Sequence, residues 1–453
     1  MILHNSLSEK SEQRTFSRSF SNLKVNQHLR NAGIKKTYGF SAISVFQLIF
    51  QLVFLGKNWY RLLDSDRKSD LPGKDTVYRF LNQERYAWRK FLYNISLTII
   101  QSFDKLTSAS RVKVFIVDDS LLQRNRSKKA ELLARLYDHA SHRFMKGYSM
   151  LTLGWSDGFS FVPIDFTMLS SAKQSNRLSE MNDDLDKRTH GFKRRKEALQ
   201  KKPDAVVQML TNALKAGFSA DYILMDSWFT QAPLLRGLAE KEMPVIGMVK
   251  ELNQRYLYKG QKLSLKELYE RIPKNRKVAI IGSALVRTPC GIPLKLVFVQ
   301  NRNNRRDWLA ILSTDIGLDD AEIVRIYGMR WSIETFFKFA KSYLKLGTEF
   351  QGRSFDMLIS HTTIVFTRYL VLEWERRNNC DNRTFGGIFY LFCDEVRDMD
   401  LKTAIQNLMV FILTILDKRP RNDKATILCQ LYNWINGLPN YIKGLLANLC
   451  CES

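Results

Sequence analysis

Four side chains around residue 330 combine one carboxylate with groups that bind anions. Tyr327, Arg330, Glu334 and Lys341 follow the spacing Y-x2-R-x3-E-x6-K within the run AEIVRIYGMRWSIETFFKFAKSYLKLG. Residues of an α-helix are rotated by about 100° from one to the next, so this spacing places all four within a sector of roughly 60°. The pattern predicts a helix face on which a carboxylate holds a metal ion while its neighbours hold phosphate groups.

The predicted helix has one charged face and one apolar face. Lys338 and Lys345 extend the charged face, so that a single acid stands among four cations and a tyrosine. The opposite face carries Ile326, Met329, Ile333, Phe336, Phe337, Ala340 and Leu344. A helix divided in this way packs its apolar side on a core and presents the other side to solvent or to a ligand.

Two aspartates at the ends of predicted strands could complete a site with Glu334. The apolar run VKVFIV predicts a buried strand followed by Asp118 and Asp119, and the run DYILMDSWF places Asp226 at the end of a second strand. Active sites of open α/β sheets lie beyond the carboxyl ends of their strands. Three converging carboxylates repel one another unless cations bind between them, which favours Mg2+ and two-metal phosphoryl transfer. Each acid taken alone could instead be a solvated or capping side chain.

The composition favours a polyanionic partner. The 453 residues include 70 lysines and arginines against 45 aspartates and glutamates, a net charge of +25, and 45% of the residues are hydrophobic. A chain of this length can bury a large core in about two to four domains. The charge fits nucleic acid or an anionic membrane surface better than a need for solubility alone.

A membrane partner is not expected. The most apolar stretch, residues 40–56, is short for a membrane span and contains Gln47 and Gln51, so it predicts a buried helix. The first residues lack the apolar run of a signal peptide. Six cysteines without a C-x2-C pair, together with only six histidines, fit a reducing compartment and no structural zinc site. We therefore expect a cytoplasmic protein.

The first part of the chain reads as an arm followed by helices. We expect residues 1–30 to form a flexible basic arm and residues 31–107 to form a helical DNA-binding domain. Within the second unit, a turn containing Pro and Gly precedes a helix that opens at Lys74 and exposes Arg79 and Arg85, an organisation like helix-turn-helix. Any small helical bundle would give the same pattern.

The remainder predicts an α/β fold with a β-rich segment and a helical end. A hairpin turns at Ser156-Asp157-Gly158, and the polar stretch 170–203 is expected to be a loop. We divide this part of the chain into a catalytic core in two pieces, a β-rich insertion domain between them and a helical C-terminal region that could serve dimerisation: 108–249 and 319–346 with Glu334, 250–318, and 347–453.

The motifs FIVDDS, YILMDSW and Y-x2-R-x3-E-x6-K together resemble those of bacterial insertion-sequence transposases of the cut-and-paste DDE type. The resemblance covers residues 110–346 well and the flanking helical regions loosely. It implies a ribonuclease-H-like catalytic core with a β-rich insertion domain, flanked by helical regions. By motif match, Asp118, Asp226 and Glu334 would be the catalytic acids and the ligands of two Mg2+ ions, with Mn2+ as a substitute. Asp119, on the opposite face of the strand, would support the loop.

The resemblance also implies how the chain would meet DNA. Tyr327, Arg330 and Lys341 would hold the phosphates of the element ends, and Lys338 and Lys345 lie on the same predicted face. The partner would be double-stranded DNA, both the element ends and the target. Because pairing two ends requires two active sites, a homodimer on DNA is expected. The protein would work in the bacterial cytoplasm, associated with the nucleoid.

The implied reaction is cleavage at the ends of the protein's own element and joining of the 3′-hydroxyl ends to target DNA. In relatives with this signature, the first hydroxyl attacks the opposite strand and makes a hairpin intermediate. A base flipped against an aromatic ring would ease the sharp bend of that hairpin. Trp228, Trp308 and Trp331 are candidates, and a core position is at least as good an interpretation of each.

Two rival functions remain open from the sequence. A ribonuclease-H-like nuclease outside transposition would keep the acids without needing the tyrosine, arginine and lysine at this spacing. A non-catalytic DNA-binding protein derived from a transposase would tend to lose a carboxylate, and none is lost here. Three basic groups would neutralise DNA phosphates in a salt-dependent way, or would form solvated faces: 124–146, 187–202, and Arg302 with Arg305 and Arg306.

Overall fold

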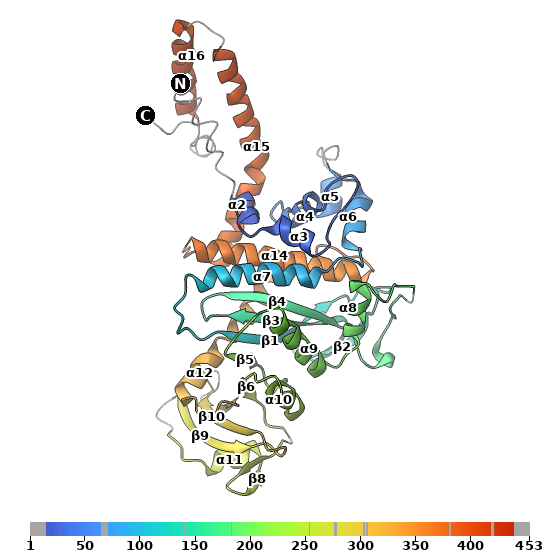
Figure 1. Cartoon of the computed structure of the whole chain (residues 1–453), viewed down its shortest axis with the longest axis vertical. Coiled ribbons are helices and arrows are strands. Elements are labelled where there is room, and N and C mark those ends of the chain that lie inside the picture. The colour runs from blue at the N-terminus through green and yellow to red at the C-terminus, as the bar shows by residue number, and fades with distance from the viewer. Residues whose placement is uncertain are drawn as a thin grey trace.

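The computed structural model describes most of the chain. The described residues are 15–64, 71–139, 141–182, 184–252, 254–275, 279–301, 304, 307–379, 382–417 and 421–438. A sheet crosses the middle of the molecule, with a helical part on one side of it and a β-rich part on the other (Figure 1).

The central sheet has antiparallel strands on one side and parallel strands on the other. Its strand order is β4-β3-β1-β5-β6. β3 pairs antiparallel with both β1 and β4, whereas β1, β5 and β6 run parallel. The bounds are Val114–Gln123 for β1, Arg143–Ser156 for β3, Phe161–Leu169 for β4, Tyr222–Met225 for β5 and Val245–Val249 for β6. The expected hairpin is confirmed as β3 and β4, and β1 continues through Asp118 and Asp119 instead of ending before them.

The β-rich segment continues the same sheet. β11 pairs antiparallel with β6, and β10, β9, β7 and β8 follow in that order. Its elements are β7 (Tyr256–Tyr258), β8 (Gln261–Leu263), α11 (Leu265–Arg271), β9 (Ile280–Arg287), β10 (Pro293–Gln300) and β11 (Trp308–Ser313). A β-rich segment after β6 was expected from the sequence, while its status as a separate insertion domain stays a prediction.

Two long helices cover the sheet on the side of β4. α7 (Trp88–Asp104) and α14 (Phe355–Asn378) lie side by side there (Figure 1). Every residue of α14 from Phe355 to Glu373 is buried, which is the expected environment of a helix that is not divided into two faces. Three further helices lie near the sheet: α8 (His190–Ala198) contacts β4, α9 (Lys202–Lys215) contacts β3 and β4, and α10 (Ala232–Ala239) contacts α9.

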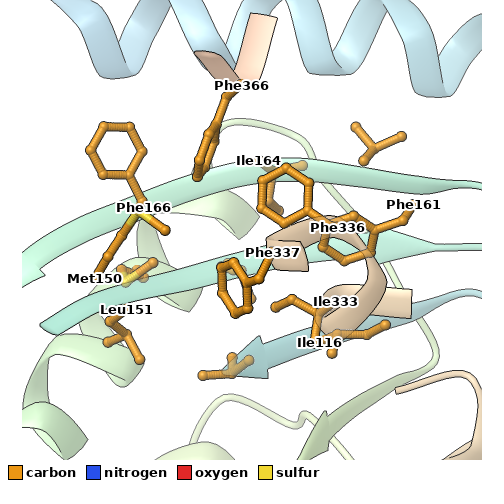
Figure 2. Close-up of a cluster of buried hydrophobic side chains, with 14 of the residues drawn as sticks. Ile116, Met150, Leu151, Phe161, Ile164, Phe166, Ile333, Phe336, Phe337 and Phe366 are labelled. Atoms are coloured by element: carbon orange, nitrogen blue, oxygen red, sulfur yellow. The ribbon is translucent and has the colours of Figure 1, made fainter. Parts of the chain in front are cut away.

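The helix that carries Glu334 is fixed by an aromatic cluster (Figure 2). α13 (Trp331–Ser342) places the ring of Phe336 5.2 Å from that of Phe161 in β4 and 5.0 Å from that of Phe366 in α14. Ile333, Phe337, Ala340 and Leu344 are buried as well, as the apolar face of the sequence predicted. This packing joins the Glu334 helix to the sheet and to α14 at once.

The flexible arm expected for residues 1–30 is corrected where the structure describes it. Residues 15–30 contain α2 (Thr15–Asn22) and most of α3 (Val25–Asn31), and the side chains of Phe20, Val25 and Leu29 are buried in the core. The sequence missed this because the apolar residues are few and widely spaced. Residues 1–14 lie outside the described part of the chain.

The expected helical regions at both ends are present. The N-terminal one contains α4 (Ala42–Gln51), α5 (Trp59–Leu63), α6 (Lys74–Leu81) and α7. After α14, helices α15 (Phe385–Asp417) and α16 (Arg421–Gly437) project away from the body of the molecule (Figure 1). In the part of the chain that the structure describes, no helix is long and apolar enough to cross a membrane.

Two elements within strongly charged stretches were also missed in the sequence. The polar stretch 170–203 is not a plain loop, because it contains α8, whose start is capped by the Thr189 hydroxyl accepting the amide of Phe192. The basic segment 124–146 contains the short strand β2 (Ala134–Asp138), which pairs with the first residues of β3. Both were hidden by a high density of charged residues.

Candidate active site

The parallel pairing of β1 with β5 brings two of the predicted acids together. Val117 of β1 pairs with Met225 of β5, so Asp118 and Asp226 are the next residues on neighbouring strands. Such strands lie about 4.8 Å apart. The Asp118 carboxylate accepts the amide of Asp119 at 2.8 Å, and the Asp226 carboxylate accepts the amide of Trp228, also at 2.8 Å.

The third acid comes from a helix that is interrupted just before it. The sequence predicted one continuous helix through Tyr327 and Lys341, but α12 (Asp320–Gly328) ends and α13 begins at Trp331. The prediction of a single helix is therefore wrong, because Gly328 favours an end to the helix and Met329 and Arg330 form a turn. Tyr327 lies at the end of α12, and Glu334 lies in the first turn of α13.

Arg330 lies at the junction between the two helices and contacts two of the three acids. Its guanidinium lies 3.4 Å from a carboxylate oxygen of Asp118 and donates a short hydrogen bond to Glu334. It also lies 5.8 Å from the ring centre of Tyr327. The structure therefore brings together Asp118, Asp226, Glu334, Tyr327 and Arg330.

The surroundings of Asp118 disfavour its charged form. Burial and the neighbouring charge of Asp226 raise the pKa of Asp118 to about 7, although Arg330 and the Asp119 amide act against the rise. Burial likewise raises the pKa of Tyr327 to about 12. Burial opposes the charge on Arg330, but Tyr327, Glu334 and Asp118 together raise its pKa. A further cation beside Asp118 and Asp226 would relieve the repulsion between them.

Asp118, Asp226 and Glu334 all offer carboxylate oxygens, which are the ligands that a hard divalent cation such as Mg2+ prefers. As they are placed, no group of three or more His, Cys, Asp or Glu side chains among the described residues could hold a metal ion. The contact of Glu334 with Arg330 accounts for this within the cluster. The acids match the chemistry of a magnesium site, and Glu334 would have to leave Arg330 to join it.

The three lysines of the predicted charged face lie in different settings. Lys341 is exposed and donates to the carbonyl of Leu121 at 3.2 Å, and partial desolvation by the surrounding protein lowers its pKa. Lys338 is exposed on α13. Lys345 is exposed beyond the end of the helix at Ser342 and has a positive φ of 59°, so the prediction that it continues the helix face is wrong.

Asp119 has its own partners on the other face of β1. Its carboxylate accepts the Ser149 hydroxyl at 2.6 Å and pairs with the Lys202 ammonium at 3.0 Å. Lys202 also lies 4.3 Å from the ring centre of Trp228, two residues after Asp226. Sequence analysis missed Lys202, which was one cation within the group 187–202. Its position at the start of α9 is the one signal that could have separated it from the others.

The basic groups predicted to meet DNA are only partly available. Arg194 and Arg195 are buried, and Arg195 pairs with Glu131 and Asp356, so these two cannot form a solvated face in this structure. Burial lowers the pKa of Arg194. Lys193, Lys196 and Lys201 of the same group are exposed. Arg302, Arg305 and Arg306 lie outside the described residues.

The tryptophans proposed to receive a flipped base differ in exposure. Trp331 is 65% exposed at the start of α13, and Trp228 is 40% exposed beneath Lys202. Trp308 instead stacks on Tyr269, with ring centres 4.6 Å apart and an interplanar angle of 16°. Two of the three candidates therefore offer a ring to solvent, on the segments that carry Asp226 and Glu334.

Comparisons with known proteins bear on the same residues. Residues 68–264 match a family model described as DDE superfamily endonuclease, and residues 199–370 match one described as transposase DDE domain. The first range contains Asp118 and Asp226, and the second contains Asp226 and Glu334. The two matches support a DDE transposase.

Two other comparisons add little. No curated protein is significantly similar to the chain in sequence. Among solved structures, a chain of the Drosophila P element transposase strand transfer complex is similar, with 13% sequence identity and a TM-score of 0.22. The match covers 58% of this chain and 55% of that chain, so it spans about half the length of the solved transposase.

Proposed function

We propose that this protein is a DNA transposase that cuts at the ends of its own insertion element and joins the resulting 3′-hydroxyl ends to target DNA. The observation that carries the proposal is that Arg330 contacts both Asp118 and Glu334, while Asp226 lies beside Asp118 on the neighbouring strand, so that acids from three elements far apart in the sequence lie close together. The matches to the DDE superfamily endonuclease and transposase DDE domain models, which together include all three acids, support it.

The topology of the central sheet supports a ribonuclease-H-like core. Three antiparallel strands, β4, β3 and β1, adjoin two strands, β5 and β6, that run parallel to β1. Asp226 follows the carboxyl end of β5, and Asp118 lies on β1 at the point where its parallel pairing with β5 ends. Active sites of open α/β sheets form beyond the carboxyl ends of their strands. Helix α13, which contacts β1 and β4, carries Glu334.

The acids would hold Mg2+, which activates the attacking oxygen and stabilises the leaving oxygen of an in-line phosphoryl transfer. Asp118 and Asp226 hold negative charge at one point of the sheet, and the raised pKa of Asp118 reflects that arrangement. Glu334 is the acid whose partner must change, because Arg330 now binds it. Arg330, released from the acids, would bind a DNA phosphate, since a guanidinium fits phosphate oxygens well.

A homodimer on DNA is part of the proposal, because two element ends require two sites. The projecting helices support it: Leu408, Phe411 and Ile415 of α15 are exposed by 52%, 61% and 43%. Their spacing of three and four residues places them on one face of the helix. Exposed apolar faces of this kind mark interaction surfaces. A hairpin intermediate, a bacterial insertion-sequence origin and a DNA-binding role for the N-terminal helices complete the proposal as expectations of the resemblance.

The test is excision in vitro. A plasmid carrying the gene with its native flanks is incubated with the purified protein and Mg2+, beside Glu334→Gln. We expect excision by the wild type and a loss of more than about 100-fold in the variant. Glu322→Gln is the matched control, because Glu322 lies on α12 and pairs with Arg325 near the surface, away from the acids.

Each other outcome identifies a different function. Cleavage that ignores the flanks would indicate a ribonuclease-H-like nuclease outside transposition. DNA binding without cleavage by the wild type would indicate a non-catalytic protein derived from a transposase. Excision by Glu334→Gln at the wild-type rate would refute the assignment of Glu334.

A further inference from the structure

The hairpin of β2 and β3 carries two exposed aromatic rings outside the cluster of acids. Tyr137 of β2 and Phe144 of β3 are directly opposite each other and are 40% and 66% exposed. Their ring centres are 5.2 Å apart, with an interplanar angle of 69°. Side chains at paired positions point to the same side of a sheet, so the two rings form one outward surface.

Cations stand directly beside these rings. The guanidinium of Arg135 lies 5.8 Å from the ring centre of Phe144, and the residue paired with Arg135 is Lys146. The imidazole of His139 lies 5.0 Å from the ring of Tyr137. Arg135 lies two residues before Tyr137, and Lys146 lies two residues after Phe144. Side chains two residues apart on a strand point to the same side, so both cations share the side of the rings. We call Arg135, Tyr137, Phe144 and Lys146 the hairpin face.

The hairpin face is connected to the candidate active site through one strand. Thr152 of β3 pairs with Asp118, and Phe144 lies eight residues before Thr152 on the same strand. At about 3.3 Å per residue, the rings stand roughly 26 Å from the acids along β3. Because an even number of residues separates Phe144 from Thr152, alternation places the rings on the same side of β3 as Thr152, which is the side of Asp118.

We propose that the hairpin face stacks unpaired bases of a DNA strand that leaves the active site. Aromatic rings on an exposed sheet surface, interleaved with cations, offer stacking to bases and charge to the phosphates between them. Paired duplex offers only groove edges and phosphates, for which the cations would suffice without the rings. The proposal rests on the proposed function, since it places a single strand on the path from the acids.

The hairpin face is tested by equilibrium binding of the full chain in EDTA, so that nothing is cut. Fluorescence anisotropy compares a labelled single-stranded oligonucleotide with a blunt duplex of the same sequence. For the double variant Tyr137→Ala/Phe144→Ala we expect single-strand affinity to fall by about 5- to 100-fold, with duplex affinity within about threefold of the wild type. Phe144→Trp, which keeps a ring, should retain single-strand affinity.

Phe159→Ala is the matched control, because Phe159 in the turn after β3 is 56% exposed and lies at the opposite end of that strand from Phe144. It should leave both affinities unchanged. Equal losses for single strand and duplex in the double variant, or no loss for either, would overturn the stacking proposal while leaving the proposed transposase intact. Failure of the wild type to bind any DNA would overturn both. Both substituted rings are exposed, and thermal unfolding of each variant verifies that the fold is retained.

Discussion

The ammonium of Lys202 lies 3.0 Å from the carboxylate of Asp119, at the start of α9. The same ammonium lies 4.3 Å from the ring centre of Trp228. Asp119 adjoins Asp118 on β1, and Trp228 follows Asp226 by two residues. One side chain therefore links the two segments that carry the paired aspartates, and it holds the Asp119 carboxylate away from them.

Replacement of Lys202 should weaken metal binding without removing a metal ligand. In Lys202→Met the Asp119 carboxylate loses its countercharge and the Trp228 ring loses its cation, so the two aspartates are held less firmly. Residues that orient metal ligands typically contribute about 10- to 100-fold in affinity. We expect Mn2+ affinity, measured by electron paramagnetic resonance without DNA, to fall by about 10-fold.

The neighbouring Lys201 supplies the control for this prediction. It is exposed immediately before α9, and Lys201→Met makes the same change of charge one residue away. That variant should bind Mn2+ as the wild type does, and Lys202→Arg should retain most of the affinity. Equal losses in Lys201→Met and Lys202→Met would show a general effect of charge and refute the positioning role.

Arg330→Ala should separate metal binding from catalysis. The guanidinium now contacts Asp118 and Glu334, where it competes with any other cation, and it is the group proposed to bind a DNA phosphate. At pH 8.5 we expect Mn2+ affinity to rise severalfold, because the competing charge is gone. Excision should fall by about 100-fold, because a positioned charge on the transferring phosphate is lost. Parallel losses of Mn2+ affinity and excision would contradict this account.

The site was more predictable than the elements that carry it. Asp118 and Asp226 were recognisable because continuous apolar runs mark buried parallel strands, and the register of β1 with β5 then places their next residues together. Glu334 was recognised because the spacing of the charged residues around it matches one face of a helix. The break at Met329 and Arg330 was not predicted, because the apolar spacing continues across a turn whose backbone remains nearly helical.

Long-range charge pairing accounts for most of what the sequence could not show. Arg195 looked like part of a basic surface, but it is buried between Glu131 and Asp356, which lie 64 and 161 residues away. Lys202 looked the same and instead reaches Asp119, 83 residues away. The spacing of residues in the sequence indicates which side chains are neighbours on one helix or strand. It does not indicate which distant acid a given lysine or arginine will pair with in the folded chain.

Gly154 on β3 should be sensitive to substitution, because its neighbour is a packed aromatic ring. A Cβ atom there would lie 2.2 Å from the ring of Phe161. That ring packs on Phe336, which belongs to the same helix as Glu334. We expect Gly154→Ala to destabilise the protein by about 1–3 kcal/mol in urea unfolding, as overpacked core positions do. Gly328→Ala, where a Cβ atom would meet nothing within 4 Å, should be neutral or stabilise by up to about 1 kcal/mol. Similar effects at both positions would refute the steric argument.

The buried imidazole of His361 should make stability depend on pH between about 7.5 and 5.5. His361 on α14 lies 2.8 Å from a carboxylate oxygen of Glu349, and Arg368 lies 2.9 Å from the same oxygen. Burial lowers the pKa of His361, with Arg368 and Arg124 acting in the same direction and Glu349 against it. The unfolded chain therefore takes up a proton near pH 6.5 while the folded chain does not, so stability falls as the pH drops below that value.

In His361→Gln this source of pH dependence is absent, and an amide nitrogen can still donate to Glu349. We expect the increase of Tm with pH over this window to become smaller in the variant, whatever its absolute Tm. Other groups also act in this window: burial lowers the pKa of His28 and of His190, and the raised pKa of Asp118, about 7, acts in the opposite direction because the folded chain takes up that proton first. Glu349 does not contribute in this window, since its pKa is lowered from a value that is already below it. His139→Gln, at an exposed position on the hairpin, should keep the wild-type slope. An unchanged slope in His361→Gln would show that His361 takes up its proton in the folded protein as readily as in the unfolded chain.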